Sequence, residues 1–288
     1  MRQTQKGYSL ERACRYFGYG RSGYYKAVGE ERKVETSRDL VLQWVQEHRR
    51  YQPRLGGKKL YKLIGPDLCQ LGKRIGRDKF FDILRDKGLL VARKKQYQKT
   101  TNSYHRFRKH KNHFKDKEVQ APNQAYVSDI TYLKTREKFI YLFLITDAYS
   151  RMIVGWHLSD SLAIEGALRA AEMAIKQCPN TKGVMHHSDR GFQYCCPRYE
   201  QVMLENKMII SMTEENHCYE NAMAERVNGI LKDEFLLDEE MTDLKTAQKA
   251  VKQAIEIYNT RRPHWSLQLQ IPSKVHQQSY ILEKSKKK

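Results

Sequence analysis

Up to about residue 91, apolar residues recur every three to four positions, the spacing of amphipathic helices. Residues 9–27 hold two short periodic stretches broken at Gly18 and Gly20, which predicts a small helical hairpin. Three further helices are predicted, at Arg38–Arg49, Lys58–Leu71 and Arg77–Lys87, because glycines separate these periodic stretches. We therefore expect residues 1–95 to form an all-α region.

Beyond residue 121 the apolar residues gather in short runs rich in β-branched and aromatic side chains. These runs predict five strands, at 125–135, 138–150, 151–159, 183–189 and 208–212. Helical spacing predicts helices at 162–177, 197–207, about 221–235 and 245–260. Three consecutive strands followed by alternating helix and strand indicate an α/β fold, with helices packed on a mixed five-stranded sheet.

Residues 96–120 separate the two regions and lose apolar periodicity. They are basic with interleaved aromatics, which predicts a partly disordered linker able to follow phosphates. A plain solvated linker fits the same composition. The predicted organisation is thus a helical region at 1–95, this linker, an α/β core at 121–275 and a basic tail at 276–288.

Positive charge is concentrated at the N-terminal end. The chain has a net charge of +20; residues 1–120 carry 31 Lys and Arg against 12 Asp and Glu, and the remainder carries 22 against 21. Such asymmetry favours a polyanionic partner, because displaced counterions drive nucleic-acid binding. A basic helical unit suits helix-turn-helix docking on DNA. A solvated basic surface and an ordinary helical bundle stay open as alternatives.

Membrane insertion and zinc binding both lack support. The longest strongly apolar run, Phe139–Ile145, has seven residues, whereas a bilayer needs about 20. The six cysteines include no CxxC pair, which indicates a reduced intracellular protein with structural thiols. A zinc site is conceivable, but two adjacent pairs lack the usual ligand spacing: His186, His187, Cys195 and Cys196.

Three acidic residues occupy positions where a sheet can bring them together. Asp129 lies inside the first predicted strand, Asp189 ends the fourth, and Glu225 lies on the helix after the fifth. In-line attack on a phosphodiester uses two metal ions about 3.5–4 Å apart. Mg²⁺ prefers oxygen ligands and keeps several waters, so a few carboxylates suffice to bind it.

The helix that carries Glu225 is amphipathic. At 100° per residue, an apolar stripe faces the core: Met223, Val227, Ile230 and Leu231. The opposite face is polar, and we expect it to lie toward DNA: Asn221, Glu225, Asn228 and Lys232. A surface helix with a solvated glutamate gives the same pattern, so the helix alone does not decide.

Five strings carry a family resemblance: PNQAYVSDITYL, YLFLITDAYSRMIVGWHLSDS, HHSDRGFQY, NHCYENAMAERVNGILKDEF and YNTRRPHWSLQLQIPSKV. From Pro122 to Val275 their order and spacing resemble the OrfB-type transposases of insertion-sequence family three, relatives of retroviral integrases. The helical segments at 9–27 and 38–91 resemble the family's N-terminal segments more weakly. The 35 residues between Asp189 and Glu225 match the D,D-35-E pattern of this superfamily.

The resemblance implies a ribonuclease H-like integrase core that cleaves and joins DNA strands at terminal inverted repeats. It implies that Asp129, Asp189 and Glu225 bind two Mg²⁺ ions, with Mn²⁺ as a substitute, and that Lys232 contacts DNA. Tyr126 stands where the family often has Trp, and Glu220 where it usually has Asp. Other predicted DNA contacts are Asn221, Asn228, Arg77, Lys79, Arg106, Arg108 and Lys109.

The resemblance further implies a homo-oligomer on DNA, an upstream-frame partner or fusion, and a cytoplasmic, nucleoid-associated bacterial protein. We expect His186 and His187 to pack or support the site rather than bind metal. The turn at 261–264 either contacts DNA or caps a helix. Two other functions stay open: a nuclease of the same fold that does not join strands, and a catalytically idle DNA-binding regulator.

Overall fold

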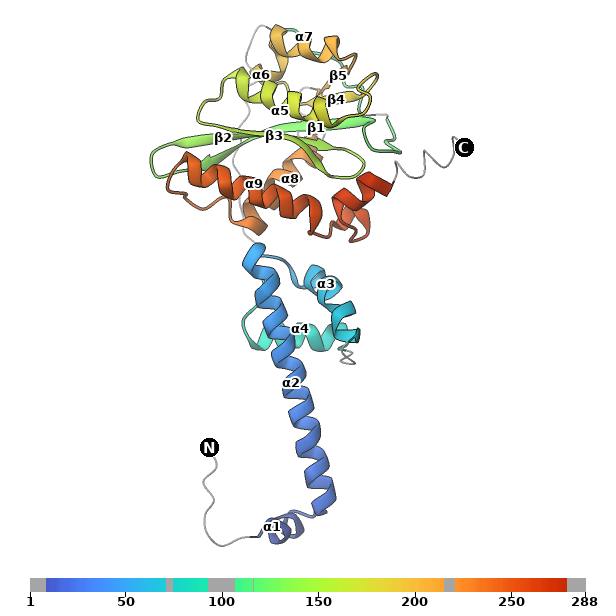
Figure 1. The fold of residues 1–288 in the computed structure, drawn as a ribbon, viewed down its shortest axis with the longest axis vertical. Helices are drawn as coiled ribbons and strands as arrows, with labels where there is room; N and C mark the ends of the chain where they lie inside the picture. The colour runs from blue at the N-terminus through green and yellow to red at the C-terminus, as the bar shows by residue number, and fades with distance from the viewer. Residues whose placement is uncertain (1–8, 71–74, 93–106, 116, 215–220, 279–288) are drawn as a thin grey trace. The chain divides into compact units, whose positions relative to one another are not determined.

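The β-branched runs form one mixed sheet, with strand order β3-β2-β1-β4-β5 (Figure 1). The first three strands are antiparallel neighbours, while β4 and β5 run parallel to β1. Their bounds are β1 Ala125–Lys134, β2 Phe139–Asp147, β3 Ile153–Ser159, β4 Met185–Ser188 and β5 Ile209–Met212. The predicted mixed five-stranded sheet is confirmed.

This computed structural model describes residues 9–70, 75–92, 107–115, 117–214 and 221–278. The chain divides into two units, one of residues 1–50 with 56–90 and one of residues 51–55 with 91–288. Among the described residues, no helix is both long and apolar enough to span a membrane.

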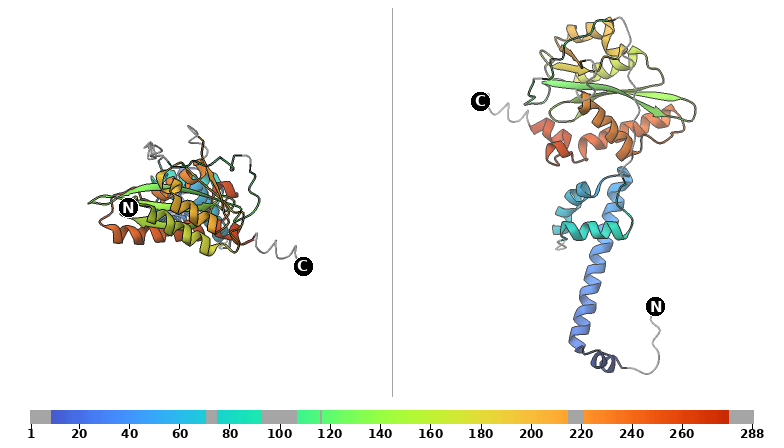
Figure 2. Two further views of the ribbon diagram at one scale, coloured as in Figure 1. Left: turned by 90° about the horizontal axis from the view of Figure 1, so that it is seen from above. Right: turned by 180° about the vertical axis from the view of Figure 1, so that it is seen from behind.

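Helices cover both faces of the sheet (Figures 1 and 2). One face packs against α5 Ile164–Gln177, α6 Phe192–Cys195 and α7 Pro197–Glu205, and the other against α8 Ala222–Phe235 and α9 Leu244–Thr260. Each face has its own apolar cluster, because strand side chains alternate between the two sides. A short 3₁₀ turn, Trp265–Leu267, follows α9.

The N-terminal unit is all-helical in its described residues. Its helices are α1 Leu10–Tyr16, α2 Arg21–Tyr51, α3 Gly57–Gln70 and α4 Arg77–Asp86. The sequence predicted a break between the hairpin and the helix at 38–49, and this is wrong: α2 continues through 31 residues. Its middle is rich in Glu, Arg and Lys, which favour helix even where no apolar stripe marks the segment.

Residues 107–115, which the sequence assigned to the linker, lie against the α/β core. The Met212 N–H donates to the Lys111 carbonyl over 3.3 Å, and the His113 N–H donates to Ser211 Oγ over 2.9 Å. The Phe114 ring stacks on His187 with centroids 4.9 Å apart. This segment therefore covers the outer edge of β5, which would otherwise present unpaired backbone groups.

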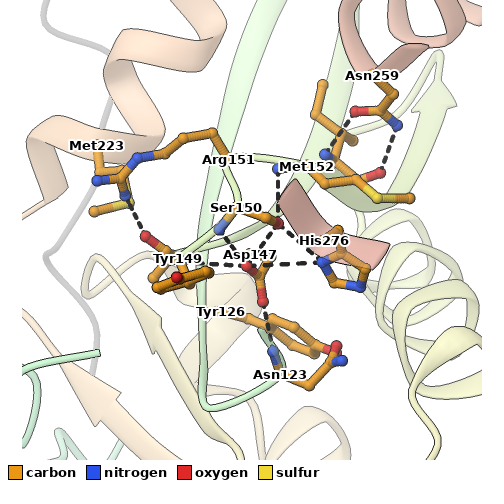
Figure 3. Close-up of polar contacts among 12 residues, drawn as sticks. Asn123, Tyr126, Asp147, Tyr149, Ser150, Arg151, Met152, Met223, Asn259 and His276 are labelled. Atoms are coloured by element: carbon orange, nitrogen blue, oxygen red, sulfur yellow. Dashed lines mark hydrogen bonds and ion pairs between the residues drawn. The ribbon is translucent and has the colours of Figure 1, made fainter. Parts of the chain in front are cut away.

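A buried carboxylate orders the turn between β2 and β3 (Figure 3). Asp147 is fully buried and accepts hydrogen bonds from the Asn123 N–H at 2.7 Å and from the Ser150 N–H and Oγ, each at 2.7 Å. Ser150 Oγ also lies 2.9 Å from His276 Nδ1. The side chains join the β2 end, the segment before β1 and the helical residues 272–278, so their role is structural.

Candidate active site

Asp129 and Asp189 lie side by side because of the strand register. In the parallel β1–β4 pair, Val127 is opposite His187. Asp129, in the middle of β1, and Asp189, directly after the last residue of β4, each follow this pair by two residues. Because alternate residues of a strand share a face, both aspartates are expected on the same side of the sheet. The Gly191 N–H donates to Asp189 Oδ1 over 3.0 Å, which orients this carboxylate at the start of the next turn.

Two amides dock α8 beside these acids. Asn221 Nδ2 donates to the Ser128 carbonyl over 3.1 Å, and Asn228 Nδ2 donates to Asp129 Oδ2 over 2.7 Å. Both asparagines are buried, with exposed fractions of 4% and 5%. Glu225 lies between them on the same helical face and is exposed. The polar face thus lies toward β1, and Glu225 lies within electrostatic reach of Asp189.

The three carboxylates repel one another. Desolvation, together with the negative charge of Asp189 and to a lesser extent of Glu225, raises the pKa of Asp129 to about 7. The hydrogen bonds from Asn228 and the Ile130 N–H act in the opposite direction. Desolvation and the charge of Asp189 also raise the pKa of Glu225. Such mutual repulsion is typical of a site that a cation would stabilise.

Lys232 supplies positive charge next to this cluster. Burial lowers the pKa of its ammonium group, while the charge of Asp129, and then of Asp238 and Asp233, raises it. The influence of Asp129 indicates that Lys232 reaches toward the acids from two turns farther along α8.

The two histidines before Asp189 support the sheet. His186 Nε2 lies 2.7 Å from Ser128 Oγ and 3.0 Å from the Tyr199 hydroxyl oxygen, within hydrogen-bonding distance of both. Burial lowers the pKa of His186 to about 3, so its ring is neutral. His187 Nδ1 lies 2.9 Å from Ser211 Oγ. Both contacts lie within the protein, in keeping with the packing role that the sequence favoured.

The donors are all carboxylate oxygens, which fit a hard divalent ion. Within the described ranges, no three His, Cys, Asp or Glu side chains stand close enough to hold a metal as they are. Glu225 is exposed and therefore has the rotational freedom to approach Asp129 and Asp189. The three acids therefore fit a divalent ion by their chemistry and charge. In the described part of the chain, the zinc site considered from the sequence, of His186, His187, Cys195 and Cys196, is not supported by the structure.

Most predicted DNA contacts lie on the surface, in different parts of the chain. Arg77 and Lys79 are exposed on the first turn of α4, and Arg108 and Lys109 are exposed on the segment over β5. Arg106 lies outside the described residues. Asn221 and Asn228 instead bond within the protein, as described above. Contact of each of these residues with DNA stays a prediction.

Sequence reasoning left the role of Arg262 open, and the structure shows a buried ion pair. Arg262 Nε and Nη2 donate to the two carboxylate oxygens of Glu234 over 2.9 and 2.8 Å. Gln52 Nε2 donates to the same carboxylate over 2.5 Å, and the guanidinium lies 5.5 Å from the Tyr258 ring centroid. The pair anchors the end of α8 to the turn after α9. No local sequence signal marks the pair, because its partners are 28 positions apart.

Comparisons with known proteins decide the family. Residues 119–218 and 206–272 each match an integrase core domain. The 31 kDa protein of insertion element IS600 from Shigella sonnei is 33% identical over 256 residues, which cover 87% of this chain and 92% of that protein. The chain belongs to the IS3-type insertion-sequence transposases.

Other relatives agree with the transposase assignment. Transposase InsF for insertion sequence IS3A of Escherichia coli K12 is 27% identical over 268 residues, covering 90% of this chain and 91% of that protein. Among solved structures, the HTLV-2 integrase catalytic core domain in complex with magnesium is similar over 55% of this chain and 99% of that chain, with 18% identity and a TM-score of 0.45. The resemblance inferred from the five sequence strings is confirmed at the level of the family and of the integrase core domain by the family matches and the IS600 relative.

The raised pKa of Asp129 predicts a pH-dependent stability difference in the metal-free transposase. The pKa of Asp129 is about 7 in the folded protein and about 3.9 in the unfolded chain. Between these two pH values the folded state therefore binds the proton more tightly than the unfolded state does. The cost of the charged carboxylate is therefore full above pH 7 and disappears below pH 4. With EDTA present, Asp129→Asn is expected to exceed the wild type in unfolding free energy at pH 8, by at most about 4 kcal/mol.

Denaturant titrations at several pH values measure that difference, which is expected to shrink as the pH falls from 8 to 5. Asp160→Asn is the matched control, because Lys138 lowers the pKa of Asp160 and moves its titration below this window. Its difference from the wild type should stay flat from pH 5 to 8. A flat difference for Asp129→Asn as well would show that Asp129 is not perturbed.

Proposed function

We propose that this transposase uses Asp129, Asp189 and Glu225 for metal-dependent cleavage and strand transfer at the ends of an insertion element. The observation that supports this most directly is the β1–β4 register, in which Asp129 and Asp189 each follow the pair Val127 and His187 by two residues. Their charges influence one another, and Asp189 also acts on Glu225. Carboxylates gathered in this way are suited to phosphoryl transfer on DNA.

The three acids would bind two Mg²⁺ ions, and Mn²⁺ would replace them. Bound there, two divalent ions would supply electrostatic stabilisation of the attacking and leaving oxygens in an in-line displacement. Asn228 holds the Asp129 carboxylate by its Oδ2 atom, so the second oxygen is oriented as well. Lys232 would bind a phosphate of the element end, since it lies within the electrostatic reach of Asp129.

Binding of DNA would be shared by both units. Residues 1–120 carry most of the excess charge, and exposed cations lie on α4 and over β5: Arg77, Lys79, Arg108 and Lys109. Strand transfer holds two DNA segments at once, which favours a homo-oligomer on DNA. An upstream-frame partner stays a prediction of the family resemblance.

The test uses a duplex with the terminal inverted repeat that flanks this reading frame, incubated with the full chain and Mg²⁺ or Mn²⁺. We expect cleavage at the repeat end and joined products, both dependent on the metal. Cleavage without joined products would instead favour the nuclease. Binding without chemistry, even with any upstream-frame protein added, would favour the idle regulator.

Asn228→Ala is expected to weaken metal binding, because Asp129 loses the amide that favours its charged form. Loss of such a supporting hydrogen bond typically lowers metal affinity about 10- to 100-fold. The Mg²⁺ concentration at half-maximal cleavage should rise accordingly, and the rate should largely recover at saturating Mg²⁺. Asn206→Ala is the control, since the Asn206 side chain donates within its own helix segment, to the Val202 carbonyl of α7 over 2.8 Å. Equal Mg²⁺ curves for both variants would rule out the positioning role.

A further inference from the structure

Phe192 presents an aromatic ring one residue beyond the turn that orients Asp189. The Gly191 N–H that contacts the Asp189 carboxylate immediately precedes it. The side chain of Phe192 is 46% exposed, whereas the other three residues of α6 are buried. Burying such a ring would stabilise the fold by about 2 kcal/mol, so packing gives no reason for leaving it at the surface here.

A second aromatic side chain supports this ring from a distant part of the chain. Phe107 lies 5.1 Å from Phe192 between ring centroids, at an interplanar angle of 47°, and is itself packed against the core cluster. The segment that carries Phe107 is held in place by His110 Nε2, 2.8 Å from Glu200 Oε1. The hydrogen bond between Met212 and Lys111 fixes it further. The two rings therefore form one anchored aromatic platform.

Each ring of the platform has a cation two residues away in the sequence. Lys109 follows Phe107, and Arg190 precedes Phe192. Both cations act on the Cys195 thiol of α6 and oppose the rise in its pKa, so both lie near this short helix. Aromatic rings interleaved with cations are the composition of surfaces that bind unpaired nucleic acid, in which bases stack and phosphates pair with charges.

We propose that the platform of Phe107 and Phe192 stacks an unpaired DNA base next to the phosphate that reacts at Asp189, with Lys109 and Arg190 binding the adjacent phosphates. This inference rests on the proposed function, which places the reacting phosphate at Asp189. A base can offer its face to a side chain only after leaving the duplex stack. Stacking on a ring fixed beside the carboxylates would hold an opened end in one position during the reaction.

The experiment measures DNA binding apart from catalysis. Full-length protein is titrated, with Ca²⁺ present, against a duplex bearing the terminal repeat and against duplexes with a single abasic site at each of the three positions either side of the scissile phosphate. Phe192→Ala is expected to weaken binding to the intact duplex about tenfold, the size of one lost base–aromatic contact. Phe192→Trp should restore binding, and Phe192→Leu should not. One of the abasic positions removes the base that stacks on Phe192. On that duplex the wild type and Phe192→Ala should bind with equal affinity.

Phe139→Ala is the matched control, because Phe139 is 58% exposed and also contacts an aromatic ring, that of Tyr132, 6.4 Å away between centroids. Its binding should equal that of the wild type, and thermal melts should show that each variant is folded. The proposal is overturned if Phe192→Ala binds like the wild type, if Phe192→Leu restores binding, or if no abasic position equalises the two proteins.

The proposed function has a separate readout, which is metal-dependent cleavage of the same duplex by the wild type. Cleavage together with unchanged binding by Phe192→Ala would overturn the stacking alone. Absence of cleavage together with the expected binding pattern would overturn the proposed catalytic role alone, because the binding titration does not depend on turnover.

Discussion

Asp189→Asn is expected to reduce cleavage and joining at least about a thousandfold, equivalent to about 4 kcal/mol of transition-state free energy. The change keeps the size of the side chain and an oxygen that can accept from the Gly191 N–H. It removes the charge that raises the pKa of both Asp129 and Glu225. The expected loss is therefore one of divalent-ion binding rather than of folding.

Three measurements separate this loss from misfolding. Affinity for the terminal-repeat duplex in Ca²⁺-free buffer should stay within about twofold of the wild type, because most of the positive charge lies in residues 1–120. The pKa of Asp129 should fall toward its usual range once its strongest repulsive partner is gone. Asp160→Asn, outside the site and paired with Lys138, should cleave normally. Residual joining by Asp189→Asn above a few per cent would contradict the assignment.

Arg262→Met is expected to destabilise the α/β core by about 3–5 kcal/mol, because it leaves Glu234 as an uncompensated charge in a largely buried position. The side chains of this pair are 1% and 15% exposed, for Arg262 and Glu234 respectively. Gln52 would still donate to the carboxylate, but an amide does not neutralise it. Denaturant titration measures the loss, and hydrogen exchange of the α8 amides assigns it to the core.

The second variant for this pair removes both charges. Arg262→Met with Glu234→Leu should recover most of the stability, since a well-packed apolar pair avoids the cost of desolvating two ions. Arg198→Met is the matched control: its pair with Glu165 is 65% and 58% exposed, and an exposed pair contributes at most about 1 kcal/mol. If Arg262→Met and Arg198→Met were equally mild, the burial of the Arg262 pair would have no energetic consequence.

The α/β sheet was predictable because each strand carries its own signal in a few consecutive residues. Runs such as 125–135 and 138–150 are rich in β-branched and aromatic residues, and the structure has strands within both. The continuous α2 was missed for the converse reason. Its polar middle has no apolar period, so its only local signal is the helix propensity of its Glu, Arg and Lys residues.

The candidate site was predictable in part. Asp129, Asp189 and Glu225 were found by strand position and by spacing within family-like strings, and the structure places them within electrostatic reach of one another. The two asparagines of α8 were assigned to DNA from helical phase alone. That phase was right about a shared polar face, but it could not tell a face toward solvent from one toward β1.

The sequence by itself determined four features of this protein: the family, the sheet, the three candidate acids and the basic N-terminal region. Each of them has a signal in the local composition or in the spacing of residues along the chain. Only the tertiary structure decided the bond of Asn228 to Asp129, the pairing of Arg262 with Glu234 and the meeting of Phe107 with Phe192. Their partners are separated by 99 and 28 positions for the hydrogen bonds, and the two rings come from different segments of the chain. Such contacts depend on how strands register and helices dock, and no local pattern in the chain specifies that.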